Sequence, residues 1–165
     1  DAVRVDAEAK DPYFVAKQIA AYAKANSFEI VLTGKETINY NGAQIGSMIA
    51  EMLDQPFVSL AQKLDVSGNT ATLERDVPGG AEVVEVNTPF VLSAAKGMAE
   101  QRIPNMRGIM AARTKALNVI PAVETAELTS IVSYSMPPAK SECKYIDADN
   151  MTELVELLHN EAKVI

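Results

Sequence analysis

The chain has 165 residues, of which 48% are hydrophobic and 22% charged, a composition typical of a globular protein rather than a disordered one. Its net charge of −7 argues against a general nucleic-acid-binding protein, which needs a basic face, and no apolar run approaches the ~18 residues of a membrane span. A single cysteine, Cys143, and a single histidine exclude an intrachain disulfide, a cysteine zinc site and any site that needs two histidines.

The first 32 residues predict a strand, a helix and a second strand. An apolar run at residues 2–5 favours a strand, and Asp11 followed by Pro12 is typical of a helix start, because aspartate caps free N–H groups and proline tolerates the first helical position. A second apolar run follows at residues 28–32. This order indicates a βαβ unit and a parallel sheet. Because the chain begins at Asp1 and opens as if within a domain, we expect further sequence on its N-terminal side.

A polar loop at residues 33–46 separates the second strand from a helix expected over residues 43–53. Ligands of open α/β sheets lie off the carboxyl ends of the strands, and a helix N-terminus there favours a phosphate. Gly34 and Gly42 allow close backbone approach. The loop matches neither a Walker A nor a GxGxxG pattern, so a nucleotide site and an ordinary connecting loop both remain open.

The middle of the chain reads as strands joined by short turns, which favours an antiparallel extension on the parallel core. The strands are expected near residues 57–66, 70–76, 81–87 and 89–94.

Basic residues then predominate. Between residues 96 and 115 five bases stand against one acid, Glu100, with apolar side chains among them. Such a run is typical of a solvated surface, and it is also consistent with a docking surface for an acidic partner in which an apolar residue acts as the anchor.

The last forty residues resemble an arm. Residues 125–143 show little periodicity and predict an extended connector. Asn150 with Glu153 resembles a capping box, and an amphipathic helix follows. Its apolar stripe has to be buried, either on its own domain or on another subunit.

Three motifs, in order, resemble the electron-transfer flavoprotein β subunit. The run LERDVPGGAEVVEVNTPFVLSA at residues 73–94 is similar to the family signature, with departures at Leu73 and Pro78. GKETINYNGAQIG at residues 34–46 is similar to the family's nucleotide loop, with Asn39 where an acid is common. IPNMRGIMAARTK, which begins at Ile103, is similar to the family's recognition loop and basic helix.

The resemblance implies an electron carrier rather than an enzyme, with no catalytic residue or metal of its own. Such β subunits pair with an α subunit that holds most of the FAD, and they bind AMP or a second FAD themselves. The heterodimer carries electrons from acyl-CoA or other flavin dehydrogenases to a membrane quinone reductase or a similar acceptor, without entering the membrane or binding nucleic acid. The implied location is the cytoplasm, or the mitochondrial matrix in a eukaryote.

The resemblance also implies a fold class and domains. We expect an α/β fold with a partly parallel sheet of the adenine-nucleotide-binding type, an antiparallel β extension and a C-terminal arm that ends in a helix. Residues 1–120 would form the nucleotide-binding domain and residues 121–165 the arm, which would wrap the α subunit. The family's first strand and its flavin-approaching loop do not precede Asp1, so about a third of a β subunit is expected to be missing, leaving sheet edges exposed.

Residue by residue, the match assigns a nucleotide loop and a docking residue. The phosphate is expected at the helix start, near Ala43, Gln44 and Ile45. Met106 or Ile103 is expected to plug into the dehydrogenase beside Arg107, with Met106 preferred because the Gly-Ile-Met match continues into the basic helix. The nucleotide loop comprises Gly34, Lys35, Glu36, Thr37, Ile38, Asn39, Tyr40, Asn41, Gly42, Ala43, Gln44 and Ile45.

Two other functions remain as alternatives. A nucleotide-binding regulatory module of related α/β fold would lack electron transfer, and it would not copurify with a yellow flavin-containing partner. An adenine-nucleotide-using ligase or hydrolase would need a carboxylate for Mg²⁺ near the loop, where only Glu36 is available.

Overall fold

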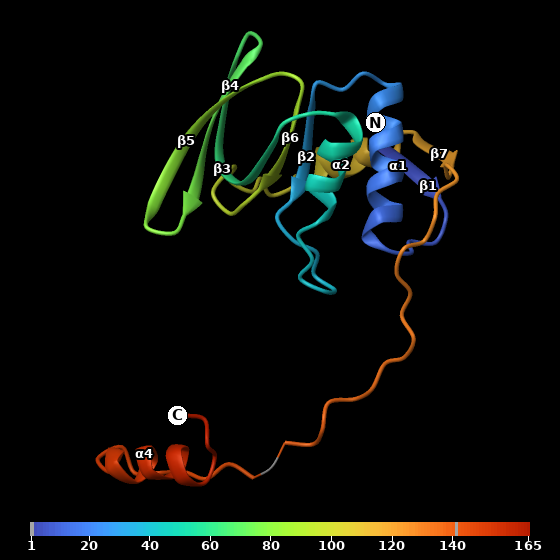
Figure 1. Cartoon of the computed structure of the whole chain (residues 1–165). Coiled ribbons are helices and arrows are strands. Elements are labelled where there is room, and N and C mark those ends of the chain that lie inside the picture. The colour runs from blue at the N-terminus through green and yellow to red at the C-terminus, as the bar shows by residue number, and fades with distance from the viewer. Residues whose placement is uncertain (1, 141) are drawn as a thin grey trace. The chain divides into compact units, whose positions relative to one another are not determined.

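The computed structural model describes residues 2–140 and 142–165, which fall into two compact units that divide after Ser130 (Figure 1). The second unit contains one helix, α4 (Met151–Asn160). The first unit contains β1 (Ala2–Asp6), α1 (Pro12–Ala25), β2 (Ile30–Gly34), α2 (Ile45–Leu53), β3 (Phe57–Ser67), β4 (Thr70–Val77), β5 (Gly80–Asn87), β6 (Phe90–Ala94), α3 (Met106–Arg113) and β7 (Leu117–Pro121).

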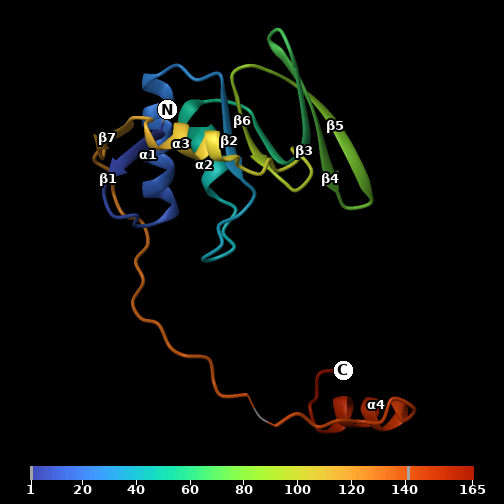
Figure 2. The same cartoon turned by 180° about the vertical axis from the view of Figure 1, so that it is seen from behind.

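The larger sheet of the first unit has five strands in the order β2-β6-β3-β4-β5. Strand β6 runs parallel to both β2 and β3, whereas β3, β4 and β5 form an antiparallel meander. The meander continues the sheet away from the helices (Figures 1 and 2). The expected α/β fold, with an antiparallel extension on a parallel core, is therefore confirmed.

The side chains of β6 alternate between two cores. Phe90 and Leu92 are fully buried with Leu73 in a core formed by β3, β4 and β6. Val91 lies on the opposite face, where it packs with Ile49 of α2 and with small side chains of α1. Because successive side chains of a strand point to opposite faces, one short apolar strand serves both cores, and α2 is held tightly against β2 and β6.

Strand β1 does not join β2. It pairs in parallel with β7, from Ala2 opposite Leu117 to Asp6 opposite Pro121, in a separate two-stranded sheet. Among the described residues, the predicted βαβ unit in one sheet is therefore wrong. The prediction failed because apolar runs indicate that strands exist but do not indicate which strands pair.

Two element boundaries fall later than expected, because backbone turns precede them. Strand β2 begins at Ile30 since Ser27 adopts a left-handed conformation and the Phe28 N–H still donates to Ala23 O at the end of α1. Helix α2 begins at Ile45 since Asn41 is also left-handed and belongs to a closed loop.

Residues 122–140 and 142–143 contain neither helix nor strand, which agrees with the connector predicted at residues 125–143, of which residue 141 lies outside the described residues. The cap of α4 is confirmed: the Glu153 N–H donates to Asn150 Oδ1 at 3.3 Å, and Asn150 Nδ2 donates to Glu153 Oε2 at 2.7 Å. None of the helices within the described part of the chain is long and apolar enough to cross a membrane.

Candidate nucleotide loop and docking helix

A cleft of about 250 Å³ lies at the carboxyl end of β2, beside the start of α2. This is where ligands bind in open α/β sheets. Its walls are Ile19 of α1, Val31, Leu32, Thr33 and Gly34 of β2, Glu36, Thr37, Gly42 and Ala43 of the loop, and Ile45 and Gly46 of α2.

The loop beside the cleft is closed by Thr37. The Thr37 N–H donates to Gly42 O at 3.0 Å, the Asn41 N–H donates to Thr37 O at 2.9 Å, and the Gly42 N–H reaches Thr37 Oγ1 at 3.3 Å. Three hydrogen bonds across so few residues give the loop a fixed shape.

The structure brings half of the predicted loop residues to the cleft. Gly34, Glu36, Thr37, Gly42, Ala43 and Ile45 line it. Lys35, Ile38, Asn39, Tyr40, Asn41 and Gln44 are exposed and do not line it. Ile38 is 96% exposed and Tyr40 65% exposed, so the closed loop presents an apolar tip to solvent.

The start of α2 leaves backbone donors available. Gln44 occupies the N-cap position, but its side chain makes no capping hydrogen bond. The first N–H groups of a helix have no partner within the helix, and the helix dipole adds partial positive charge there. Chemically, this end of the cleft suits an anion.

Gly46 allows α2 to approach β2 closely. A Cβ atom at this position would lie 2.7 Å from Thr33 Oγ1 and 2.9 Å from a Phe57 ring carbon. By contrast, a Cβ on Gly34 or Gly42 would meet its nearest protein atom at 3.8 or 3.7 Å. The packing of α2 on β2 and β3 therefore requires a glycine at position 46, whereas packing does not require one at position 34 or 42.

The residue-by-residue assignment left out five residues that line the cleft: Ile19, Val31, Leu32, Thr33 and Gly46. Thr33 and Gly46 are the two ends of the predicted loop at residues 33–46, and Val31 and Leu32 belong to the strand before it, whose carboxyl end is where ligands lie. Ile19 carries no such signal, because its position depends on how α1 packs against α2.

The charges beside the cleft are paired. Lys35 Nζ lies 3.1 Å from Glu36 Oε1, and both side chains are about half exposed. The lysine offsets the negative charge that Glu36 brings to the wall of the cleft, although an exposed pair of this kind adds little to stability.

The signature-like run holds the meander together. Arg75 Nε donates to Glu82 Oε2 at 2.6 Å and Arg75 Nη1 donates to Ser59 Oγ at 3.0 Å, which links β4 to both of its neighbours. Ser93 Oγ accepts the Leu60 N–H at 2.9 Å, where β3 leaves its regular register with β6. These residues serve the sheet rather than the cleft.

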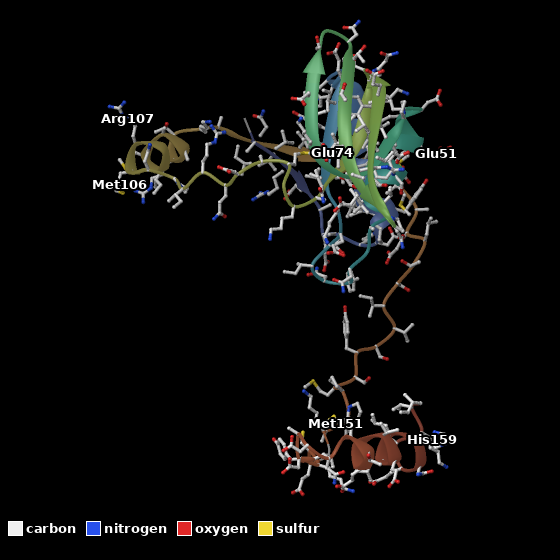
Figure 3. The ribbon with its side chains drawn as sticks, turned by 90° about the vertical axis from the view of Figure 1, so that its left-hand side faces the viewer. Glu51, Glu74, Met106, Arg107, Met151 and His159 are labelled. Carbon is white, nitrogen blue, oxygen red and sulfur yellow. The ribbon has the colours of Figure 1, made fainter. Side chains whose placement is uncertain are left out.

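Helix α3 forms a separate surface. It has no buried residue, and Figure 3 shows Met106 and Arg107 on a helix that extends away from the five-stranded sheet. Met106 is 73% exposed and Ile103 is 88% exposed. The Asn105 side chain caps the helix by accepting the Gly108 N–H at 2.8 Å, so the helix start is ordered without tertiary packing.

The bases around α3 make no ion pair with any residue that the structure describes. Among the residues that the structure describes, the ion pairs do not involve Lys96, Arg102, Arg107, Arg113 or Lys115. Their charge is thus available to an acidic surface.

The sequence model of the electron transfer flavoprotein domain matches residues 1–125. The electron transfer flavoprotein subunit beta of Bacillus subtilis is 33% identical over 97% of this chain and 66% of its own length. The Syntrophomonas wolfei subunit beta is 31% identical over 94% of this chain and 63% of its own length. The Homo sapiens subunit beta is 30% identical over 82% of this chain and 55% of its own length. This chain therefore spans less than two-thirds of the length of each of these relatives. It belongs to the electron transfer flavoprotein family, among relatives named as β subunits.

Proposed function

We propose that the chain acts as the β subunit of an αβ electron-transfer flavoprotein. It is an electron carrier that takes electrons from acyl-CoA or other flavin dehydrogenases and delivers them, within the heterodimer, to a membrane quinone reductase or similar acceptor. The observation that carries this proposal is the cleft at the start of α2, formed by the loop that resembles the family's nucleotide loop.

The nucleotide is AMP or a second FAD, bound at residues 34–45 with its phosphate at the start of α2. The uncapped helix end and the Thr37 hydroxyl supply donors there. The flavin of the complex supplies the redox chemistry, and these residues only bind and position.

The size of the cleft indicates that it holds only part of a nucleotide. Clefts that bury drug-sized ligands measure about 300–1,000 Å³, whereas this one measures about 250 Å³. The rest of the ligand therefore needs a further wall, and the uncapped start of α2 supports placing the phosphate end beside these residues.

Met106 or Ile103 docks the dehydrogenase. Both are apolar, exposed and close in sequence to unpaired bases, which is the composition of an anchor within a charged rim. The basic rim speeds encounter with an acidic partner.

Helix α4 contacts the α subunit. It has no buried residue within its own unit, and Leu154, Leu157 and Leu158 fall at helical spacing on one face. Met151 and His159 mark the two ends of this helix in Figure 3.

The test is the nucleotide content of the intact heterodimer. Gln44 does not line the cleft, but it occupies the N-cap position of α2 and its exposed amide makes no capping hydrogen bond, so we propose that this amide binds a phosphate held at the helix start. Gln44→Ala is therefore expected to lower the nucleotide released on denaturation about tenfold, whereas Gln101→Ala, in an exposed loop, keeps it unchanged. Mass spectrometry distinguishes AMP from FAD. Unchanged content in Gln44→Ala would contradict the site, and a chain that never copurifies with a yellow partner would favour the regulatory module without electron transfer.

A further inference from the structure

Residues 122–130 form an irregular segment, here called the strap, which is attached at three places to helix α1 and the two residues before it. The Gln18 side chain makes two hydrogen bonds with the Val123 backbone. Gln18 Nε2 donates to Val123 O at 2.9 Å, and the Val123 N–H donates to Gln18 Oε1 at 2.7 Å. The amide thus satisfies both the N–H and the C=O of Val123, as a neighbouring strand would in a sheet.

Asp11 makes the second attachment while it caps α1. Its Oδ1 accepts the Phe14 N–H at 2.7 Å, and its Oδ2 accepts the N–H groups of Leu128 at 2.6 Å and Thr129 at 2.9 Å. Lys10 adds an ion pair with Glu127 at 3.6 Å. Asp11 and Gln18 are 5% and 6% exposed, so these hydrogen bonds are largely shielded from water.

The strap ends where the second unit begins. The last residue of the first unit is Ser130, directly after Thr129. We propose that Asp11 and Gln18 are positioning residues that fix the strap to α1, so that the arm from residue 131 onward leaves the domain at the N-terminus of α1. This proposal rests on the function proposed above, in which the arm contacts the α subunit.

Release of the strap would lengthen the free tether of α4. With the strap fixed, about 20 residues separate Ser130 from α4, and without it about 30 residues separate β7 from α4. Effective concentration falls roughly as the −3/2 power of tether length, so the arm would engage its partner about twofold less effectively. The strap itself should lose more order than this, so its cleavage by a protease should rise by more than twofold.

The first test is cleavage of the full chain by a glutamate-specific protease, because Glu124 and Glu127 lie within the strap. Asp11→Asn still caps α1 but presents an amide N–H₂ to the N–H groups of Leu128 and Thr129. Gln18→Glu keeps the acceptor for the Val123 N–H but loses the donor to Val123 O. Each variant is expected to be cleaved at these sites about tenfold faster than the parent, and the exposed Lys24→Gln control at the parent rate.

The second test separates positioning from general stability. Association with the α subunit is measured for both variants in the full chain and in a chain that ends at Asp149. We expect an affinity loss of about twofold in the full chain and none in the shortened chain. Equal losses in both backgrounds, or unchanged cleavage of the strap, would overturn the proposal. If removal of α4, in the chain that ends at Asp149, leaves association unchanged, the proposed contact of α4 with the α subunit fails instead, whatever the strap does.

Discussion

Helices α2 and α3 each follow a polar loop, yet they differ in what they bury. Helix α2 buries Gly46, Ile49 and Ala50, and its first turn lies beside a cleft. Helix α3 buries no residue and is ordered at its start by the Asn105 cap. Burial fixes the start of α2 relative to β2, as a ligand site requires. Exposure leaves the apolar side chains of α3 available to another protein.

The largest expected effect comes from adding one methyl group to each helix. Gly46→Ala places a Cβ against Thr33 and Phe57, and overpacking of this kind costs about 1–3 kcal/mol. Gly108→Ala in α3 meets only the Asn105 side chain at 3.3 Å and gains helix propensity, so its net effect is expected to stay within about 1 kcal/mol. Urea unfolding of both variants measures the difference.

The nucleotide content of the heterodimer gives a second comparison of the Gly46→Ala and Gly108→Ala variants. Gly46→Ala is expected to lower the nucleotide bound by the heterodimer, because it displaces the start of α2 from β2, and Gly108→Ala is expected to leave it unchanged. If Gly46→Ala unfolds at the parent urea concentration and keeps its nucleotide, the contrast between a packed and an unpacked helix is wrong.

The second expected effect is on electron transfer. Met106→Ala should slow reduction of the heterodimer by its dehydrogenase about tenfold, the loss expected when a central apolar anchor is truncated. Folding stability and flavin content should not change, because the side chain is exposed. Stopped-flow reduction at limiting dehydrogenase provides the rate.

Ile103→Ala is the matched comparison for that experiment. Ile103 is also apolar and exposed, but it precedes the helix. A slow Ile103→Ala variant with a normal Met106→Ala variant would transfer the anchor to Ile103. Normal rates for both would remove this segment as the docking surface.

Local signals predicted most of the fold. Turn residues at 67–69 and 78–80 delimited the meander, because tight turns need particular residues wherever the strands lie. Asp11 and Asn150 marked the starts of α1 and α4 for the same reason, since a cap acts within its own turn. The helix start beside the candidate site was located to within two residues.

What depends on packing was not predictable. The partner of β1 is β7, more than a hundred residues later, and no local pattern specifies that choice. Ile19 reaches the cleft only because α1 packs on α2, and the strap contacts of Asp11 join residues 117 and 118 positions apart. The family resemblance supplied the loop residues but did not indicate which of them face the cleft.

The smallest expected effect is the pH response of the helix N-caps, which adds the Asp11 cap of α1 to the comparison with the Asn105 cap of α3. The hydrogen bond from the Phe14 N–H, with further ones from Leu128 and Thr129, lowers the pKa of Asp11 below its ordinary value of 3.8, against the opposing effect of burial. The stabilisation from the charged carboxylate is therefore complete above pH 3.8 and is lost as the pH falls through the lower pKa of the folded state. The neutral Asn105 cap of α3 should not respond to pH.

Amide NMR shifts of Leu128 and Thr129, followed from pH 6 to pH 2, should show a transition with its midpoint below 3.8, while Gly108 shows none. Because Glu127 lies within the strap and pairs with Lys10, the measurement is repeated in Glu127→Gln, which removes that carboxylate and should leave the transition in place. Asp11→Asn should abolish it. A midpoint at or above 3.8, or a transition that persists in Asp11→Asn, would show that Asp11 does not hold the strap through its charge, and the cap of α1 would then be equivalent to that of α3.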